Sequence, residues 1–177
     1  NLKGEIINSI KIDKTDFEGI TVVDDSLLAI VQEIKREALV INIEGKDDFS
    51  SSFKVEGSKN SGLEGITYNS SNGHFYILNE KDPVLLIEAD KDLKELSRKE
   101  IKDVKDLSGI SYSQKDNCLW IVSDEDKKII KLSTGGDFIT EYEIDINQAE
   151  GIAVDDENNL LYVVSDKEEK LYVFKIE

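Results

Sequence analysis

The amino-acid sequence predicts an all-β fold, a β-propeller of four-stranded antiparallel blades. Three observations predict it: a tetrapeptide that recurs along the chain, a pair of short β-rich runs after each copy, and a polar turn between the paired runs. The second positions of the tetrapeptides, residues 18, 64, 108 and 150, lie 46, 44 and 42 residues apart. A period of about 44 residues is typical of propeller blades and of paired-helix repeats. The copies are Phe17-Glu18-Gly19-Ile20, Leu63-Glu64-Gly65-Ile66, Leu107-Ser108-Gly109-Ile110 and Ala149-Glu150-Gly151-Ile152.

Hairpin signals decide between these two architectures. After each Gly-Ile, two apolar runs are separated by Asp, Asn, Ser or Gly, which is the pattern of a β-hairpin. The runs are too short for helices with a 3.6-residue period. We expect first and second strands at 20–23 and 27–31, 66–68 and 74–78, 110–112 and 118–122, and 152–154 and 160–164. Third strands are expected at 38–43, 84–88, 128–132 and 170–176, and fourth strands at 138–144 and, more weakly, at 53–56 and near Ile101.

The two ends of the chain match the two halves of one blade. Residues 136–144, which include an expected fourth strand, precede the tetrapeptide at residues 149–152. Residues 4–12 precede the tetrapeptide at residues 17–20 in the same way, so the N-terminus has the pattern of a fourth strand. Residues 171–174 have the pattern of a third strand without a fourth. We therefore expect a single domain, residues 1–177, whose four repeats of about 44 residues close into a ring when the N-terminal strand pairs with the C-terminal blade. The alternative is a larger ring from which a blade is missing.

Composition excludes several classes of partner. The chain has 38 acidic and 22 basic residues and a formal net charge of −16, which disfavours nucleic acid and anionic membrane surfaces. No apolar run approaches the ~20 residues that span a bilayer, so no transmembrane segment is expected. The chain starts at Asn1 and contains no Met, so we expect that a leader or anchor lies outside it.

Acidic residues recur at two places in each repeat. Successive strands of a blade reverse direction, so the start of the first strand and the end of the second lie on the same face. We therefore expect a ring of carboxylates around one mouth of the central channel. Crowded carboxylates take up protons, pair with lysines or bind a cation, and Ca²⁺ prefers six to eight oxygen ligands. The predicted metal ligands are Glu18, Glu64 and Glu150, and the predicted ligand-binding residues around them are Ser108, Glu33, Glu80, Asp124 and Asp166.

A structural role for these glutamates is the alternative. Each Glu would accept backbone N–H bonds and hold one blade to the next. Catalytic signals are weak by comparison: His74 is the single histidine, and Cys118 lies within an apolar strand. The catalytic residues are therefore unknown at this stage.

The repeat also predicts which side chains form the core. We expect eight residues at the corresponding places of the four repeats to pack between adjacent blades. They are Ile20, Ile66, Ile110 and Ile152, with Leu28, Tyr76, Trp120 and Tyr162.

The ordered series of variant repeats resembles a known family. It includes Gly62-Leu63-Glu64-Gly65-Ile66-Thr67-Tyr68, Asn79-Glu80-Lys81-Asp82-Pro83, Asp106-Leu107-Ser108-Gly109 and Gln148-Ala149-Glu150-Gly151-Ile152-Ala153. Over essentially its whole length the chain resembles the SdiA-regulated family of bacterial β-propellers and, more distantly, esterase-like phytase and NHL-type propellers. This family usually opens with one further blade, so the resemblance implies as an alternative a five-bladed fold whose first blade is missing here.

The resemblance implies an envelope-associated protein without an established activity. We therefore expect an exported, periplasmic or cell-surface binding module that takes an unknown small molecule or protein partner, with Ca²⁺ as the cofactor to test. One alternative is a metal-dependent hydrolase of phosphate or lactone esters, an activity implied by the distant phytase-like relatives. The other is a protein-interaction scaffold. Fold alone does not decide among them.

Overall fold

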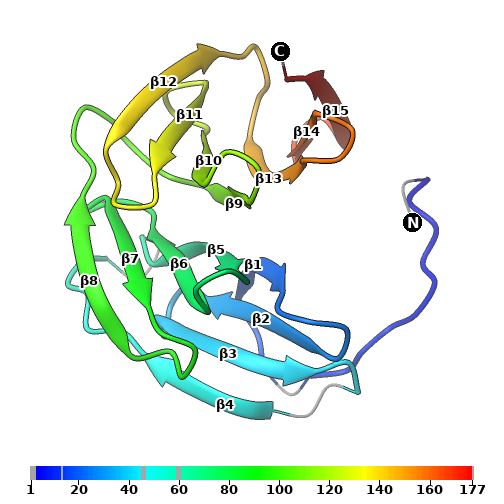
Figure 1. The fold of residues 1–177 in the computed structure, drawn as a ribbon, viewed down its shortest axis with the longest axis vertical. Coiled ribbons are helices and arrows are strands. Elements are labelled where there is room, and N and C mark those ends of the chain that lie inside the picture. Colours follow the sequence, from blue (N-terminus) through cyan, green and yellow to red (C-terminus); the bar gives the residue numbers. More distant parts are fainter. Residues whose placement is uncertain (1–2, 13, 45–46, 59–60, 177) are drawn as a thin grey trace.

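Four antiparallel sheets follow one another along the chain and are arranged around a common centre (Figure 1). The computed structural model describes residues 3–12, 14–44, 47–58 and 61–176. These residues form strands, turns and extended segments, and no helix among them is long and apolar enough to cross a membrane. The predicted all-β propeller of four repeats is confirmed in this architecture.

Each sheet is one predicted blade. The inner strands β1, β5, β9 and β13 lie toward the centre, and β4, β8 and β12 lie at the periphery (Figure 1). The first two blades are β1 (Phe17–Val22), β2 (Leu27–Gln32), β3 (Glu37–Asn42) and β4 (Asp47–Ser52), then β5 (Leu63–Asn69), β6 (His74–Asn79), β7 (Leu85–Ala89) and β8 (Glu95–Glu100). The last two are β9 (Gly109–Ser113), β10 (Cys118–Ser123), β11 (Lys128–Ser133) and β12 (Phe138–Glu143), then β13 (Ala149–Asp155), β14 (Leu160–Ser165) and β15 (Lys170–Lys175).

The turn before each second strand has the residue type that its backbone requires. Gly73, Asn117 and Asn159 directly precede β6, β10 and β14 and have φ values of 76°, 48° and 54°. Glycine and asparagine tolerate this left-handed region best, which is why they recur at hairpin turns. The first blade uses a different turn, in which the Asp24 carboxylate accepts the backbone N–H groups of Ser26 and Leu27.

One of the predicted outer strands is placed wrongly, since the structure has β4 at 47–52 instead of 53–56. The strand expected near Ile101 is β8, which spans residues 95–100 and ends just before that residue. Outer strands face solvent, and the sequence of β8, Glu-Leu-Ser-Arg-Lys-Glu, carries little β signal. Phe53 and Ile101, which suggested the strands, instead follow them and insert into the apolar core.

Apolar side chains fill the three spaces between adjacent blades. Successive residues of a strand point to opposite faces, so the middle strands of the second and third blades contribute to the spaces on both sides of their blade. In β6, Phe75 and Ile77 pack against the first blade, whereas Tyr76 and Leu78 pack against the third. Of the eight predicted core residues, five are buried as expected: Ile66, Ile110, Ile152, Tyr76 and Trp120.

The other three predictions fail at the ends of the chain. Ile20 is 60% exposed, whereas its equivalent Ile66 is 2% exposed. Ile20 lies on the side of the first blade where no preceding blade packs. Tyr162, on the far side of the last blade, is half-buried for the same reason. Leu28 is also half-buried. The prediction aligned it with Tyr76, but the residue of the first blade that corresponds to Tyr76 is Ala29, which packs between the blades.

The predicted closure of the ring is also not formed. The last sheet has three strands, β13-β14-β15, and residues 4–12 form no strand. Ile6 and Ile7 in this segment are 86% and 81% exposed. The segment runs along the open side of the arc, apart from β15 (Figure 1), and its last residue, Ile12, packs on the outer face of the first blade. Neighbouring inner strands contact each other extensively in the pairs β1–β5, β5–β9 and β9–β13. No similarly extensive contact joins β13 to β1, so the ring of inner strands is open there.

A pair of equivalent substitutions tests this arrangement. We expect Ile66→Ala to lower the free energy of unfolding by about 2–5 kcal/mol, because it leaves a cavity between two blades. The same change at Ile20 should cost about 0.5 kcal/mol or less, since that side chain is largely in solvent. Urea denaturation of both variants measures the difference, and equal losses would contradict the open arrangement of the first blade.

Candidate functional site

Close backbone approach between inner strands brings the repeated acidic residues together. A Cβ atom on Gly19 would lie 2.7 Å from the backbone oxygen of Glu64, and one on Gly109 would lie 2.8 Å from that of Glu150. Glycine is therefore the residue that allows neighbouring inner strands to touch at these points. The residue before each glycine is then held next to its counterpart in the adjacent blade, at one mouth of the channel.

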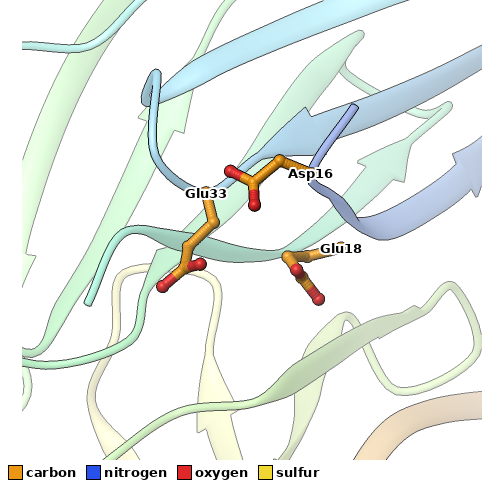
Figure 2. A group of neighbouring side chains, drawn as sticks. All are labelled: Asp16, Glu18 and Glu33. Carbon is orange, nitrogen blue, oxygen red and sulfur yellow. The ribbon is translucent and has the colours of Figure 1, made fainter. Parts of the chain in front are cut away.

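The carboxylates of the first two blades converge most closely. Asp16, Glu18 and Glu33 each offer an oxygen, and these oxygens all lie within 4.8 Å of one another. Figure 2 shows the three side chains gathered where the chain enters β1 and leaves β2. A second set with the same spacing consists of Glu33, Glu64 and Glu80, so that Glu33 belongs to both. We call these five residues the acidic cluster.

Backbone contacts between the loops fix the cluster. The Asp16 carboxylate accepts the N–H of Ile34 at 2.7 Å, and its carbonyl accepts that of Glu33 at 3.2 Å. A Cβ on Gly62 would lie 2.1 Å from the Glu33 carbonyl oxygen, so a glycine is needed where the second blade meets this loop. The N–H of Glu80 in turn donates to the Gly62 carbonyl at 2.8 Å.

The repeat position of the third blade is a hydrogen-bonding serine instead of a glutamate. Ser108, the neutral member of the repeat, is buried and donates to Asp106 at 3.0 Å. The Asp106 carboxylate also accepts Ser123 Oγ and the backbone N–H groups of Asp124 and Glu125. Asp106 thus holds the loops together through hydrogen bonds. The structural alternative in the sequence analysis assigned a role of this kind to the repeated glutamates.

The remaining predicted residues lie on the same face but outside the two sets of three. Glu150 is exposed at the start of β13, and among the neighbouring charges Asp124 and Asp166 act on it most strongly. Among the described residues, none donates a hydrogen bond to the carboxylates of Glu18, Glu64 or Glu150. The glutamates of the repeat therefore differ from Asp16 and Asp106, whose carboxylates accept backbone N–H groups.

Burial and mutual repulsion change the acidity of the cluster. Burial, followed by the charges of Glu18, Glu80, Glu33 and Glu150, raises the pKa of Glu64 to about 9. Loss of hydration and neighbouring carboxylates also raise the pKa values of Glu18 and Glu150. Burial raises the pKa of Glu33, although the N–H of Gly62 acts in the opposite direction. Without a cation, Glu64 is therefore protonated at neutral pH.

A lysine that the sequence analysis did not single out lies beside the cluster. Lys81 Nζ is 2.8 Å from Glu80 and 2.9 Å from Glu125, so it joins the second blade to the third. These two carboxylates raise the pKa of Lys81 above its ordinary value. Asp16 was missed as well, and the signal that could have identified it is its place two residues before Glu18, as Asp106 stands before Ser108.

An open cavity of about 1120 Å³ extends from the mouth along the open side of the arc. Its polar wall includes Glu18, Glu33, Glu64, Glu80, Ser108, Glu150 and Asp166. Its apolar wall includes Ile20, Tyr162, Val164 and Leu171, which belong to the first and last blades. The cavity is thus acidic at the channel and apolar toward the gap.

The single histidine and the single cysteine of the chain lie away from the acidic cluster. His74 stands at the turn between β5 and β6, at the opposite end of the inner strands, where its Nδ1 is 2.8 Å from Glu88. Cys118 is buried within β10, and burial raises the pKa of its thiol, which disfavours the nucleophilic thiolate.

Two comparisons with known proteins agree with this architecture. The model of a family described as SdiA-regulated matches residues 1–175. Among solved structures, hydrazine synthase from Kuenenia stuttgartiensis superposes with a TM-score of 0.68 at 15% sequence identity. The alignment covers 97% of this chain and 49% of that chain, so this chain spans about half the length of the similar protein. At this identity the likeness is one of fold.

The raised pKa of Glu64 predicts how stability depends on pH. A carboxyl group whose pKa is higher in the folded than in the unfolded state favours folding while it is protonated, and this contribution is lost as pH rises toward the folded pKa. For Glu64 the window runs from its ordinary value of 4.5 to about 9. In EDTA, we therefore expect the free energy of unfolding to decrease between pH 6 and pH 9.

The matched variants are Glu64→Gln, which removes the titrating group, and Glu157→Gln at the exposed turn between β13 and β14. Glu64→Gln should flatten the decrease, whereas Glu157→Gln should leave it unchanged. Urea denaturation at several pH values measures the effect. An equally steep decrease in Glu64→Gln would show that this carboxyl does not carry the raised pKa.

Proposed function

The chain belongs to the SdiA-regulated family, and we propose that it is a binding module that holds a divalent cation, best matched by Ca²⁺, in the acidic cluster. The observation that carries the proposal is the pair of overlapping carboxylate sets that share Glu33. Glu18 belongs to one of these sets and Glu64 to the other. Glu150, Ser108, Asp124 and Asp166 extend the proposed site around the rest of the mouth.

Ligand chemistry favours a hard divalent cation. Calcium takes six to eight oxygens from carboxylates, carbonyls and water, in a flexible geometry. The cluster offers carboxylate oxygens from four separate segments: the entry to β1, the loop after β2, the start of β5 and the loop after β6. Both sets consist of Asp and Glu alone. They therefore offer none of the thiolate or imidazole ligands that transition metals favour.

The electrostatics of the site favour the same conclusion. A cation would allow Glu64 to ionise, since it would replace the repulsion of four neighbouring carboxylates by attraction. Lys81 neutralises part of the charge on one side, at Glu80 and Glu125. Glu18 and Glu64 have no such partner among the described residues. The free hydrogen-bonding capacity of these glutamates supports a ligand role over the structural alternative.

Calcium titration tests the proposal. Wild type should bind Ca²⁺ and gain about 2.7 kcal/mol of stability at a hundredfold excess over Kd. Glu64→Gln keeps the shape of the side chain and removes its charge, so it should lose most of this gain, whereas Glu157→Gln should keep it. Isothermal calorimetry and thermal unfolding in Ca²⁺ and in EDTA measure both effects. If millimolar Ca²⁺, Mg²⁺ and Mn²⁺ all leave wild type unchanged, the cation site does not exist.

Cation binding should also release a proton. Because Glu64 is protonated at neutral pH in the free protein, its use as a ligand requires that it ionise. The apparent affinity for Ca²⁺ should therefore increase from pH 6 to pH 8. Calorimetry in two buffers with different ionisation enthalpies measures the number of protons released, and a binding enthalpy that is equal in both buffers would contradict a role for Glu64.

The hydrolase and the interaction scaffold, the two alternative functions, remain predictions. A metal-dependent hydrolase of phosphate or lactone esters would use the same cation beside the open cavity, and an interaction scaffold would use the propeller faces without it. The exported or surface location, which the family resemblance implies, is a prediction too. A screen of ester substrates with and without Ca²⁺ separates the hydrolase from the binding module.

A further inference from the structure

Glu80 takes part in two different interactions at the channel mouth. Its carboxylate belongs to the second carboxylate set, in which it offers an oxygen within 4.8 Å of oxygens of Glu33 and Glu64. The same side chain forms an ion pair with Lys81, whose Nζ is 2.8 Å away. A cation placed among these three carboxylates would therefore meet one that a lysine of the chain already neutralises.

Lys81 has a second carboxylate partner in the next blade. Its Nζ is 2.9 Å from Glu125, which lies in the loop after β10. Glu125 is 44 residues further along the chain and follows Asp124 as Lys81 follows Glu80. Lys81 can therefore keep one ion pair, with Glu125, when Glu80 turns to a different cation.

Hydrogen bonds hold the backbone of the loop that carries Glu80 and Lys81. The buried Asn79, at the end of β6, donates through Nδ2 to the carbonyl oxygens of Lys81 at 3.1 Å and Pro83 at 2.7 Å. On the other side, the Glu80 carbonyl accepts the N–H of Leu107 at 3.1 Å. Because the backbone is held from both sides, an exchange of partners at Glu80 needs only side-chain rotation.

The first carboxylate set has no lysine at the corresponding position. The residue after Glu33 is Ile34, which is apolar and 45% exposed. Arg36 also acts on Glu33, but its guanidinium donates its hydrogen bond to the carbonyl oxygen of Ser58 at 2.7 Å. The ion pair of Lys81 with Glu80 therefore distinguishes the second set from the first.

We infer that Lys81 competes with the divalent cation for Glu80, and that it releases this carboxylate to the cation while it stays paired with Glu125. The inference rests on the cation site proposed above and names the residue that regulates its affinity. A divalent ion attracts a carboxylate twice as strongly as an ammonium group at the same distance, whereas Na⁺ attracts it no more strongly. Lys81 thus lowers the affinity for Ca²⁺ and excludes monovalent ions from Glu80.

Calcium titration of matched lysine variants tests the competition. Lys81→Met keeps the length of the side chain and removes its charge, so it should bind Ca²⁺ about tenfold more tightly than wild type. Lys81→Arg keeps the charge and should bind as wild type does. Lys99→Met is the control, because Lys99 joins the same two blades at their periphery, with Nζ 2.6 Å from Asp137, and its affinity should be unchanged.

Isothermal calorimetry at constant ionic strength measures these affinities. A Lys81→Met affinity equal to or below that of wild type would overturn the competition and leave the cation site standing. Titrations in NaCl and in N-methylglucamine chloride, whose cation is too large for the site, measure selectivity. Sodium should weaken Ca²⁺ binding by Lys81→Met and leave wild type unchanged. Equal weakening of both proteins would overturn the exclusion of monovalent ions by Lys81.

A double-mutant cycle with Glu80→Gln separates competition from the general effect of one positive charge. In the Glu80→Gln background there is no carboxylate to compete for, so Lys81→Met should change the affinity by about twofold or less. The same tenfold gain in both backgrounds would overturn the inference, since Lys81 would then act only as a distant charge.

The same titrations distinguish failure of the inference from failure of the proposed function. Wild type without detectable Ca²⁺ binding would contradict the proposed function, whereas the competition predicts that Lys81→Met then gains binding. Binding by Lys81→Met alone would support the competition. Absence of binding in both proteins would overturn the competition together with the cation site.

Discussion

The close contact between the backbones of neighbouring inner strands is the constraint on which the rest of the structure depends. At Gly19 and Gly109 a side chain would collide with the backbone of the next blade. The glycines therefore set the spacing of the blades. The isoleucine that follows the repeat glycine lies in the interblade core at Ile66, Ile110 and Ile152, whereas Ile20, in the first blade, is exposed. The same contact fixes the residue on the other side of the glycine. Glutamates that are 46 residues apart in the sequence become neighbours at the channel mouth.

This arrangement separates two roles that look alike in the sequence. Asp16 and Asp106 hold loops through backbone hydrogen bonds, and their carboxylates are engaged in doing so. Glu18 and Glu64 are brought close to other carboxylates without such bonds. Burial of Glu64, together with the charges of these neighbours, raises its pKa. A protein that needed only to join its blades could use the aspartates for that purpose. The repulsion retained between the glutamates is what a bound cation would relieve.

Much of the fold could be predicted from the sequence because it is local and repeated. The hairpins follow from short apolar runs and their turn residues, and the buried isoleucines follow from the repeat. The outer strand β4 was misplaced, and β8 was located only as lying near Ile101, because solvent-facing strands carry polar residues and little pattern. Closure could not be predicted, because it depends on the distance between the first and last blades, which no local pattern encodes. In the site, the face and the acidic positions could be predicted, whereas the contact of Lys81 with Glu125 depends on how two loops of different blades meet.

The central claim, a cation among the carboxylates of the first two blades, is tested most directly by anomalous X-ray diffraction. Crystals grown near pH 8 and soaked in millimolar Mn²⁺ would provide a scattering signal that belongs to the metal alone. We expect an anomalous peak in contact with the carboxylate oxygens of Glu33 and Glu64, and the loss of this peak in Glu64→Gln. A well-ordered channel mouth without a peak, or a peak confined to other surface carboxylates, would contradict it.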